Sequence, residues 1–225
     1  MTVITDPLAD TDLAAIDPPE GLSGFGLGEL FFILSLHPGP VTTTTRQWLF
    51  LEDKFATPEV ALCGASSLLA RGLLTTTADE DLQLRSSAAL LEVATGRTVQ
   101  WTRVGFIGVD TQPRAAFFLQ TPVVSAVLQL DAMATWWCRF GDADDDPGAI
   151  IDALVASRFA MDPQGSVIVD TMNDTNVRRN ILVRRLDDGF AALADVKRGG
   201  TGGRELEVPP DGLPALFSGL VGATT

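Results

Sequence analysis

Three stretches late in the chain are rich in β-branched and apolar residues and are separated by turn signals. They are Ser166–Thr171, Val177–Asp187 and Phe190–Val196, with Asp188-Gly189 between the last two. An Asp-Gly pair between two such runs is typical of a β-hairpin, because the tight turn requires positive φ angles that these residues tolerate. The segment 165–196 is therefore predicted to form a three-stranded antiparallel meander.

A similar succession of strands is predicted earlier in the chain. Apolar or alternating runs at 99–109, 115–120 and 123–130 predict three strands. Asp131 then supplies a helix cap, and four large apolar residues follow at the spacing i, i+3, i+4 and i+7. These are Met133, Trp136, Trp137 and Phe140. The spacing predicts an amphipathic helix that packs an aromatic stripe on the sheet.

The clearest helix start is Thr57-Pro58-Glu59, where a hydroxyl N-cap precedes proline and an acid. This helix is predicted to run to Ala70 or Arg71, with Gly72 as a left-handed C-cap. Its apolar face is expected to contain Leu62, Ala65 and Leu69.

The rest of the pattern predicts three more helices and two further ordered segments. One helix spans Ser87–Thr95, one starts at Asp146-Pro147, and the last packs Leu213, Leu216, Phe217, Leu220 and Val221 by one face. The continuous apolar run Phe25–Leu36 fits either a buried strand or a short helix. Thr42–Leu51 is β-branched and then aromatic, which favours an extended segment. The Gly-rich stretch 198–204 is expected to be a surface loop.

The two sets of strands, each followed by a helix, indicate an internal repeat with a period of roughly 75–80 residues. One such unit buries only one face of its sheet, so a pair completes a single core. We therefore predict an α+β fold: two pseudo-twofold-related antiparallel β-meander plus helix units sharing one core, with an N-terminal helical, winged-helix-like segment. A loosely ordered acidic arm is expected at 1–23, and one domain at 24–225 with halves of about 24–141 and 142–225.

The composition is that of a globular protein with an acidic surface. Apolar residues make up 46% of the chain, and the formal net charge is −13. Such a surface repels phosphate backbones, so no nucleic-acid partner is predicted. The apolar runs are far shorter than the roughly 20 residues that a membrane-spanning helix needs. No basic residue precedes Arg46, whereas a signal peptide starts with basic residues. We predict a cytoplasmic protein without membrane insertion.

No metal or phosphate motif is complete. The acids of 142–146 resemble the start of an EF-hand loop, but Pro147 and Ala153 stand where that loop requires Gly and Glu. Gly24, Gly26 and Gly28 lack the preceding strand of a dinucleotide fingerprint, and the glycines of 199–203 lack the Lys-Ser/Thr ending of a P-loop. No metal and no cofactor are therefore predicted.

Catalytic side chains are equally scarce. His37 is the only histidine, and the chain has no nucleophile elbow that it could serve as a base. Cys63 and Cys138 lie among apolar residues and are expected to be small buried hydrophobes. The sequence therefore predicts a protein that is not an enzyme.

Thr57–Thr75 resembles the third helix of a winged-helix unit, and Thr75–Leu84 resembles its wing. A helix that reads DNA carries several Lys, Arg, Asn or Gln side chains, whereas the charged residues here are Glu59 and Arg71. A shape used for packing or protein contact is therefore favoured. A winged-helix-like transcriptional regulator and a small-molecule enzyme of unknown class remain the alternatives.

Short motifs along most of the chain resemble one known family. They are GLGEL at Gly26–Leu30, LARGLL at Leu69–Leu74, and a late ValAspThr…Arg…AspGly…ValProProAsp…Leu…Leu pattern from Val169 to Leu220. In this order the chain resembles the EspG-like chaperones of actinobacterial type VII (ESX) secretion systems. The resemblance implies a quasi-twofold α/β core. This chain is shorter than typical members, so loops that contact the substrate are expected to be cut back or absent.

The resemblance further implies a cytosolic, non-catalytic protein that binds the helical tip of a PE–PPE type secretion substrate and keeps it soluble. A protein partner, a helical secreted substrate, is thus expected. The arginine pairs of the meander make it the least acidic part of the molecule. We therefore expect the partner to contact Met172, Asn173, Asn176, Arg178, Arg179, Arg184 and Arg185.

Overall fold

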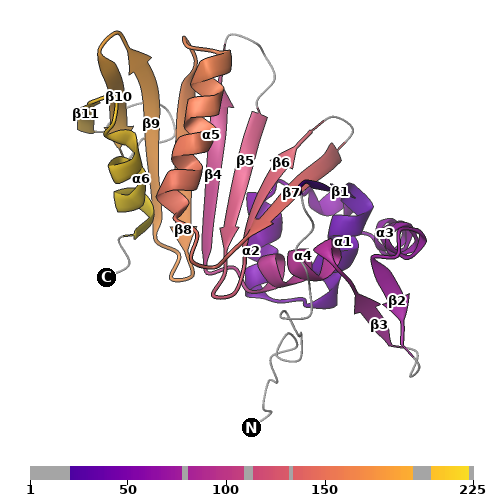
Figure 1. Cartoon of the computed structure of the whole chain (residues 1–225). Coiled ribbons are helices and arrows are strands. Elements are labelled where there is room, and N and C mark those ends of the chain that lie inside the picture. The colour runs from indigo at the N-terminus through magenta and orange to yellow at the C-terminus, as the bar shows by residue number, and fades with distance from the viewer. Residues whose placement is uncertain (1–20, 78–80, 109–113, 132–133, 195–203, 223–225) are drawn as a thin grey trace. The chain divides into compact units, whose positions relative to one another are not determined.

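The computed structural model describes residues 21–77, 81–108, 114–131, 134–194 and 204–222. Its antiparallel strands and helices (Figure 1) confirm the predicted α+β class. The chain divides into two compact units, Met1–Val99 with Leu119–Ala143, and Gln100–Phe118 with Asp144–Thr225. Most of the predicted arm and of the predicted Gly-rich loop lies outside the described residues, and the division into halves at 141/142 stays a prediction.

In the first unit, the apolar run 25–36 divides into a short strand and a helix. β1 (Ser23–Gly26) pairs antiparallel with β7 (Thr135–Gly141), and α1 (Leu27–Leu36) follows directly. The Gly26 N–H donates to Glu29 Oε2 at 2.9 Å, which satisfies a backbone donor at the start of α1. The run therefore forms both of the structures that its pattern allowed.

The expected extended segment at Thr42–Leu51 is wrong, because α2 (Pro40–Trp48) is a helix. Pro40 occupies its first turn, and the Thr42 hydroxyl accepts a hydrogen bond from the Gly39 N–H at 3.0 Å. The Thr45 hydroxyl donates to the Thr95 carbonyl at 3.2 Å. These contacts offset the cost of placing threonines in a helix, which is only tenths of a kcal/mol per residue.

The predicted helix after Thr57 is confirmed as α3 (Pro58–Ala70), with Thr57 Oγ1 accepting from the Val60 N–H at 3.3 Å and with Gly72 at φ +70°. Of its predicted apolar face, Ala65 is buried, together with Gly64 and Leu68. The prediction is wrong for Leu62, which is 68% exposed, and for Leu69, which is 46% exposed. The hairpin of β2 (Leu74–Thr76) and β3 (Leu82–Leu84) occupies the predicted wing position, after η2 (Asp53–Phe55) and α3 and before α4 (Ser87–Gly96).

The predicted aromatic helix at 131–140 is also wrong, because β7 occupies this segment and pairs with β6 (Ser125–Leu130). Trp136 and Cys138 are buried, whereas Trp137 and Arg139 are exposed. A spacing of four residues keeps Trp136 and Phe140 on one face of a helix and equally on one face of a strand. The helical template therefore matched a segment whose true period is two.

The second unit contains the predicted meander in the strand order β5-β4-β8-β9-β10-β11. The strands are β5 (Arg114–Gln120, where the unit boundary falls), β4 (Gln100–Ile107), β8 (Ser166–Asn173), β9 (Arg178–Leu186), β10 (Gly189–Ala194) and β11 (Arg204–Val208). The β9–β10 hairpin forms where the Asp-Gly signal predicted one, but its two turn residues are Asp187 and Asp188, and Gly189 at φ +154° already begins β10 and pairs with Leu186. The sequence analysis missed β11, whose Leu206 and Val208 alternate with acids.

Helices α5 (Pro147–Met161) and α6 (Leu213–Gly222) cover one face of these strands (Figure 1). Both were predicted, and Asp146 Oδ1 caps α5 by accepting from the Gly148 N–H at 2.9 Å. The core contains Val104, Val167, Val169, Ile181 and Val183 from the strands and Ile151, Val155, Phe159, Leu213, Phe217 and Val221 from the helices.

The chain order repeats four strands and a helix, with β4 to β7 followed by α5 and β8 to β11 followed by α6. Gln100 and Ser166 begin the two sets of strands, and Pro147 and Leu213 begin the two helices, so both offsets are 66 residues. The expected period of 75–80 residues was too long, because it took β7 for the closing helix of the first copy.

Candidate protein-binding surfaces

The first turn of the meander, between β8 and β9, is held by its own side chains. Asn173 Oδ1 accepts hydrogen bonds from the Val177 N–H at 2.9 Å and from the Thr175 hydroxyl at 2.8 Å. Asn176 adopts φ +62°, a left-handed conformation that asparagine tolerates. The turn therefore presents Asn176 and the 49%-exposed Val177 on an ordered backbone.

The expected exposure of Met172 is wrong. Its side chain is 7% exposed, and its directly opposed neighbour on β4, Trp101, is 3% exposed. Directly opposed side chains on neighbouring strands pack against each other. Met172 therefore supports the turn from inside, and the other predicted residues remain the prediction for partner contact.

The four predicted arginines of β9 do not share one face, because successive side chains of a strand point to opposite sides. Arg179 and Arg185 have the parity of Ile181 and Val183, which face α5 and α6. Arg178 and Arg184 lie on the opposite side, where Arg184 Nη2 is 3.3 Å from Glu205 Oε1. Of these four arginines, only Arg178 and Arg184 can therefore contact a partner on the side of the strands opposite α5 and α6.

An apolar row crosses this side, which we call the open face: the side of β8, β9 and β10 opposite α5 and α6. Ile168, Leu182 and Leu193 stand directly opposite one another in the strand register, and all three are half-buried. An ion pair between Asp170 and Arg103, with Arg103 Nε 3.0 Å from Asp170 Oδ2, lies one row away. In the sequence, the signal for the row is the apolar Ile168, which lies on the face of β8 opposite Val167 and Val169.

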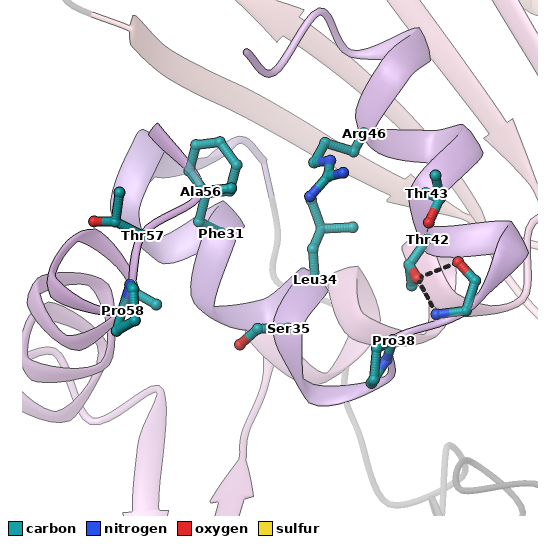
Figure 2. Close-up of a pocket in the computed structure, with 12 residues that line it drawn as sticks. Phe31, Leu34, Ser35, Pro38, Thr42, Thr43, Arg46, Ala56, Thr57 and Pro58 are labelled. Carbon is teal, nitrogen blue, oxygen red and sulfur yellow. Dashed lines mark hydrogen bonds between the residues drawn. The ribbon is translucent and has the colours of Figure 1, made fainter. Parts of the chain in front are cut away.

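A groove in the first unit lies between α1, α2 and the start of α3 (Figure 2) and has a volume of about 430 Å³. Phe31 and Leu34 of α1 are buried at its base, whereas Pro38 and Pro58 are exposed at its edges. Arg46 extends from α2 over the groove, and its Nη2 lies 3.0 Å from Asp53 Oδ1. The sequence analysis did not find this groove, because its walls come from three helices that only the tertiary fold brings together.

The side chains weighed for catalysis have structural partners. His37 Nε2 lies 2.5 Å from Glu92 Oε1, which joins the end of α1 to α4. Asp146 is used as the cap of α5, and the described residues contain no group of three or more His, Cys, Asp or Glu side chains that could hold a metal ion. These contacts give His37 and Asp146 structural roles in the fold.

The two cysteines differ in exposure, and the expected burial of Cys63 is wrong, because its side chain on α3 is exposed. Cys138 is buried in β7, and burial raises the pKa of its thiol. Because the thiolate is the reactive form, the native protein is expected to react with one equivalent of a thiol reagent at pH 8, and with two after unfolding. The variant Cys63→Ser should not react while folded; rapid native labelling of that variant would contradict the burial of Cys138.

The outer side of α3 does not fit a DNA-reading helix. The exposed residues of α3 are Pro58, Glu59, Leu62, Cys63, Ser66, Ser67, Leu69 and Ala70. The one cation of the helix end, Arg71, donates to both oxygens of Glu29 at 2.8 Å. Such a face offers neither phosphate nor base-edge contacts.

None of the helices in the described part of the chain has both the length and the apolar character that a membrane-spanning helix requires.

Comparison with known proteins gives a likeness of fold. Neither a protein-family model nor a curated protein matches the chain. Among solved structures, it is similar to the Mycobacterium tuberculosis type VII secretion system chaperone EspG5 in complex with the PE25-PPE41 dimer. The match covers 88% of this chain and 93% of that chain, with a TM-score of 0.52 and 9% sequence identity. The resemblance to EspG-like chaperones is therefore a distant one, at the level of the fold.

Proposed function

We propose that this chain is a non-catalytic, cytoplasmic protein-binding module that holds a helical secreted partner, in the manner of a type VII secretion chaperone. The observation that carries the proposal is the likeness of fold, over nearly the whole of both chains, to a chaperone solved with a protein dimer bound. At 9% identity this likeness is one of backbone fold, so the contacts with a partner depend on the surface residues of this chain.

The open face supplies a surface of suitable chemistry. Its apolar row of Ile168, Leu182 and Leu193 can receive the apolar stripe of an amphipathic helix. Arg178 lies near one end of β9 and Arg184 near the other, so carboxylates flanking that stripe would meet a cation at each end. Asn173 and Asn176 complete the proposed contact region at the first turn, whereas Arg179 and Arg185 lie on the side of α5 and α6 and are left out of it.

The test is a binding titration with a PE–PPE type pair from the native host. We expect a 1:1 complex of the chain with the pair, and we expect the double variant Arg178→Glu/Arg184→Glu to bind at least tenfold more weakly. Two reversed charges at a complementary interface cost affinity through desolvated like-charge contacts. Arg139→Glu, an exposed arginine of β7, is the matched control and should bind normally.

Two outcomes would contradict the proposal at different levels. Absence of binding by the unaltered chain to any such pair would remove the chaperone function. Tight binding that both double and control variants retain would keep the function and remove the open face as its surface. The winged-helix alternative instead requires affinity for duplex DNA that falls steeply with salt, and a flat response at low salt would exclude it.

A further inference from the structure

The groove of Figure 2 has the composition of a small-ligand site. Its volume of about 430 Å³ lies in the range of small-molecule sites, which are mostly apolar with a few polar groups. Phe31 and Leu34 form an apolar base, and Ala61 of α3 lines the side. Polar side chains at the edges of the groove include Thr43 of α2 and Ser35 of α1. A ligand would therefore bury an apolar body and leave its polar end near α2.

Arg46 determines the charge of that polar end. Its side chain lines the groove, and because its Nε is shielded from solvent, the terminal guanidinium nitrogens are the donors that a ligand can reach. Its Nη2 pairs with Asp53, whose side chain is 85% exposed. A surface pair of this kind contributes little. A carboxylate in the groove could accept from Arg46 on the side that Asp53 does not reach.

The dimensions of the groove restrict the size of the ligand. Phe31, Leu34 and Ser35 are the residues of α1 that line it, a span of five positions that rises about 6 Å along the helix axis. A helix with its side chains is about 10 Å across. The groove is therefore too short to bind several turns of a partner helix, but it accepts one alkyl chain.

From these features we propose that the groove binds the anion of a medium-chain aliphatic carboxylic acid. The carboxylate pairs with Arg46, and the alkyl chain packs on Phe31 and Leu34. This site is independent of the open face and of the proposed chaperone function. The acidic charge of −13 opposes anions at long range, but physiological salt screens that repulsion beyond about 8 Å, whereas the contact with Arg46 is direct.

The experiment is a calorimetric titration of the full chain with hexanoate, heptanoate and octanoate. Each buried methylene is worth about 0.8 kcal/mol, so the dissociation constant should fall about fourfold per added carbon until the groove is filled. Octanol, which has the same chain without the charge, should bind at least tenfold more weakly than octanoate. Equal affinity along the series, or no binding by any member, would overturn the proposal.

Two variants locate the site. Arg46→Gln should weaken octanoate at least tenfold and leave octanol unchanged, whereas Arg139→Gln, at an exposed arginine of β7, should change neither. Ala61→Phe should fill the groove and abolish both, with an unchanged far-ultraviolet spectrum as the check of folding. Unaltered octanoate binding by Arg46→Gln would overturn the proposal. The proposal would also be overturned if the groove bound a peptide that ends in a leucine carboxylate and did not bind octanoate. That result would assign the groove to a protein partner.

Discussion

Replacement of Arg71 by methionine is expected to lower the free energy of unfolding by about 3 kcal/mol. Glu29 is 3% exposed, and its carboxylate accepts from Arg71 Nη1, from the Ser67 hydroxyl at 2.7 Å and from the Gly26 N–H. Removing one partner of a buried ion pair leaves an uncompensated charge and costs about 3–5 kcal/mol. We expect the lower end, because the Arg71 side chain is 40% exposed and water can replace part of its role.

A double-mutant cycle separates this charge effect from lost packing. Arg71 also donates to the Gly24 carbonyl at 2.9 Å and stacks over the Phe25 ring, and methionine retains much of the apolar stem. Glu29→Gln in the Arg71→Met background should recover part of the loss, because a neutral amide is cheaper to bury alone than a carboxylate. Urea denaturation measures both, and Arg139→Met should stay within about 0.5 kcal/mol of the unaltered protein. A comparably small effect of Arg71→Met would show that water already solvates Glu29.

The sequence could predict elements whose signals are local. Thr57 before Pro58 and Asp146 before Pro147 mark helix starts, and the structure uses both side chains as caps. The Asp188-Gly189 signal located the β9–β10 hairpin to within one residue, because the turn at Asp187 and Asp188 depends on its own few residues. Each of these signals acts within a few residues, so each could be read without the tertiary fold.

The failures occurred where a contact distant in sequence decides the structure. Thr45 in α2 donates a hydrogen bond to the carbonyl of Thr95, 50 residues away, and no local sequence pattern predicts that hydrogen bond. Trp136 and Phe140 fit a helix and a strand equally well, and only pairing with β6 selects the strand. In α3, Leu62 and Leu69 are exposed because α1 packs against the glycine side instead.

The same distinction applies to the candidate sites. Arginine enrichment in β9 is a local signal, and it located a surface whose role remains a prediction. The faces of its arginines follow from the alternation of Ile181 and Val183, which the sequence contains, although the sequence analysis grouped all four together. The groove under Arg46 and the buried Glu29 require α1 to meet α2 and α3, so composition and spacing could not locate them.

That meeting of α1 and α3 has one sterically critical residue, Gly64. A Cβ atom there would lie 2.0 Å from the Gly28 carbonyl oxygen and 2.6 Å from the Glu29 N. These are backbone atoms, so no side-chain rotation can relieve the overlap, and the helices must separate. The separation would also draw Glu29 away from Ser67 and Arg71, which are carried on and just after α3.

Gly64→Ala is therefore expected to destabilise the protein by about 3 kcal/mol, the upper part of the usual cost of overpacking. The sign is informative, because alanine in a helix interior is normally favoured over glycine by about 1 kcal/mol. Gly219→Ala in α6 is the matched control. Among the described residues, a Cβ at Gly219 meets no heavy atom within 4 Å, so this variant should gain about 0.5–1 kcal/mol. Urea denaturation of both variants gives the two signs, and stabilisation by Gly64→Ala would mean that α1 and α3 cross less closely than their backbones now do.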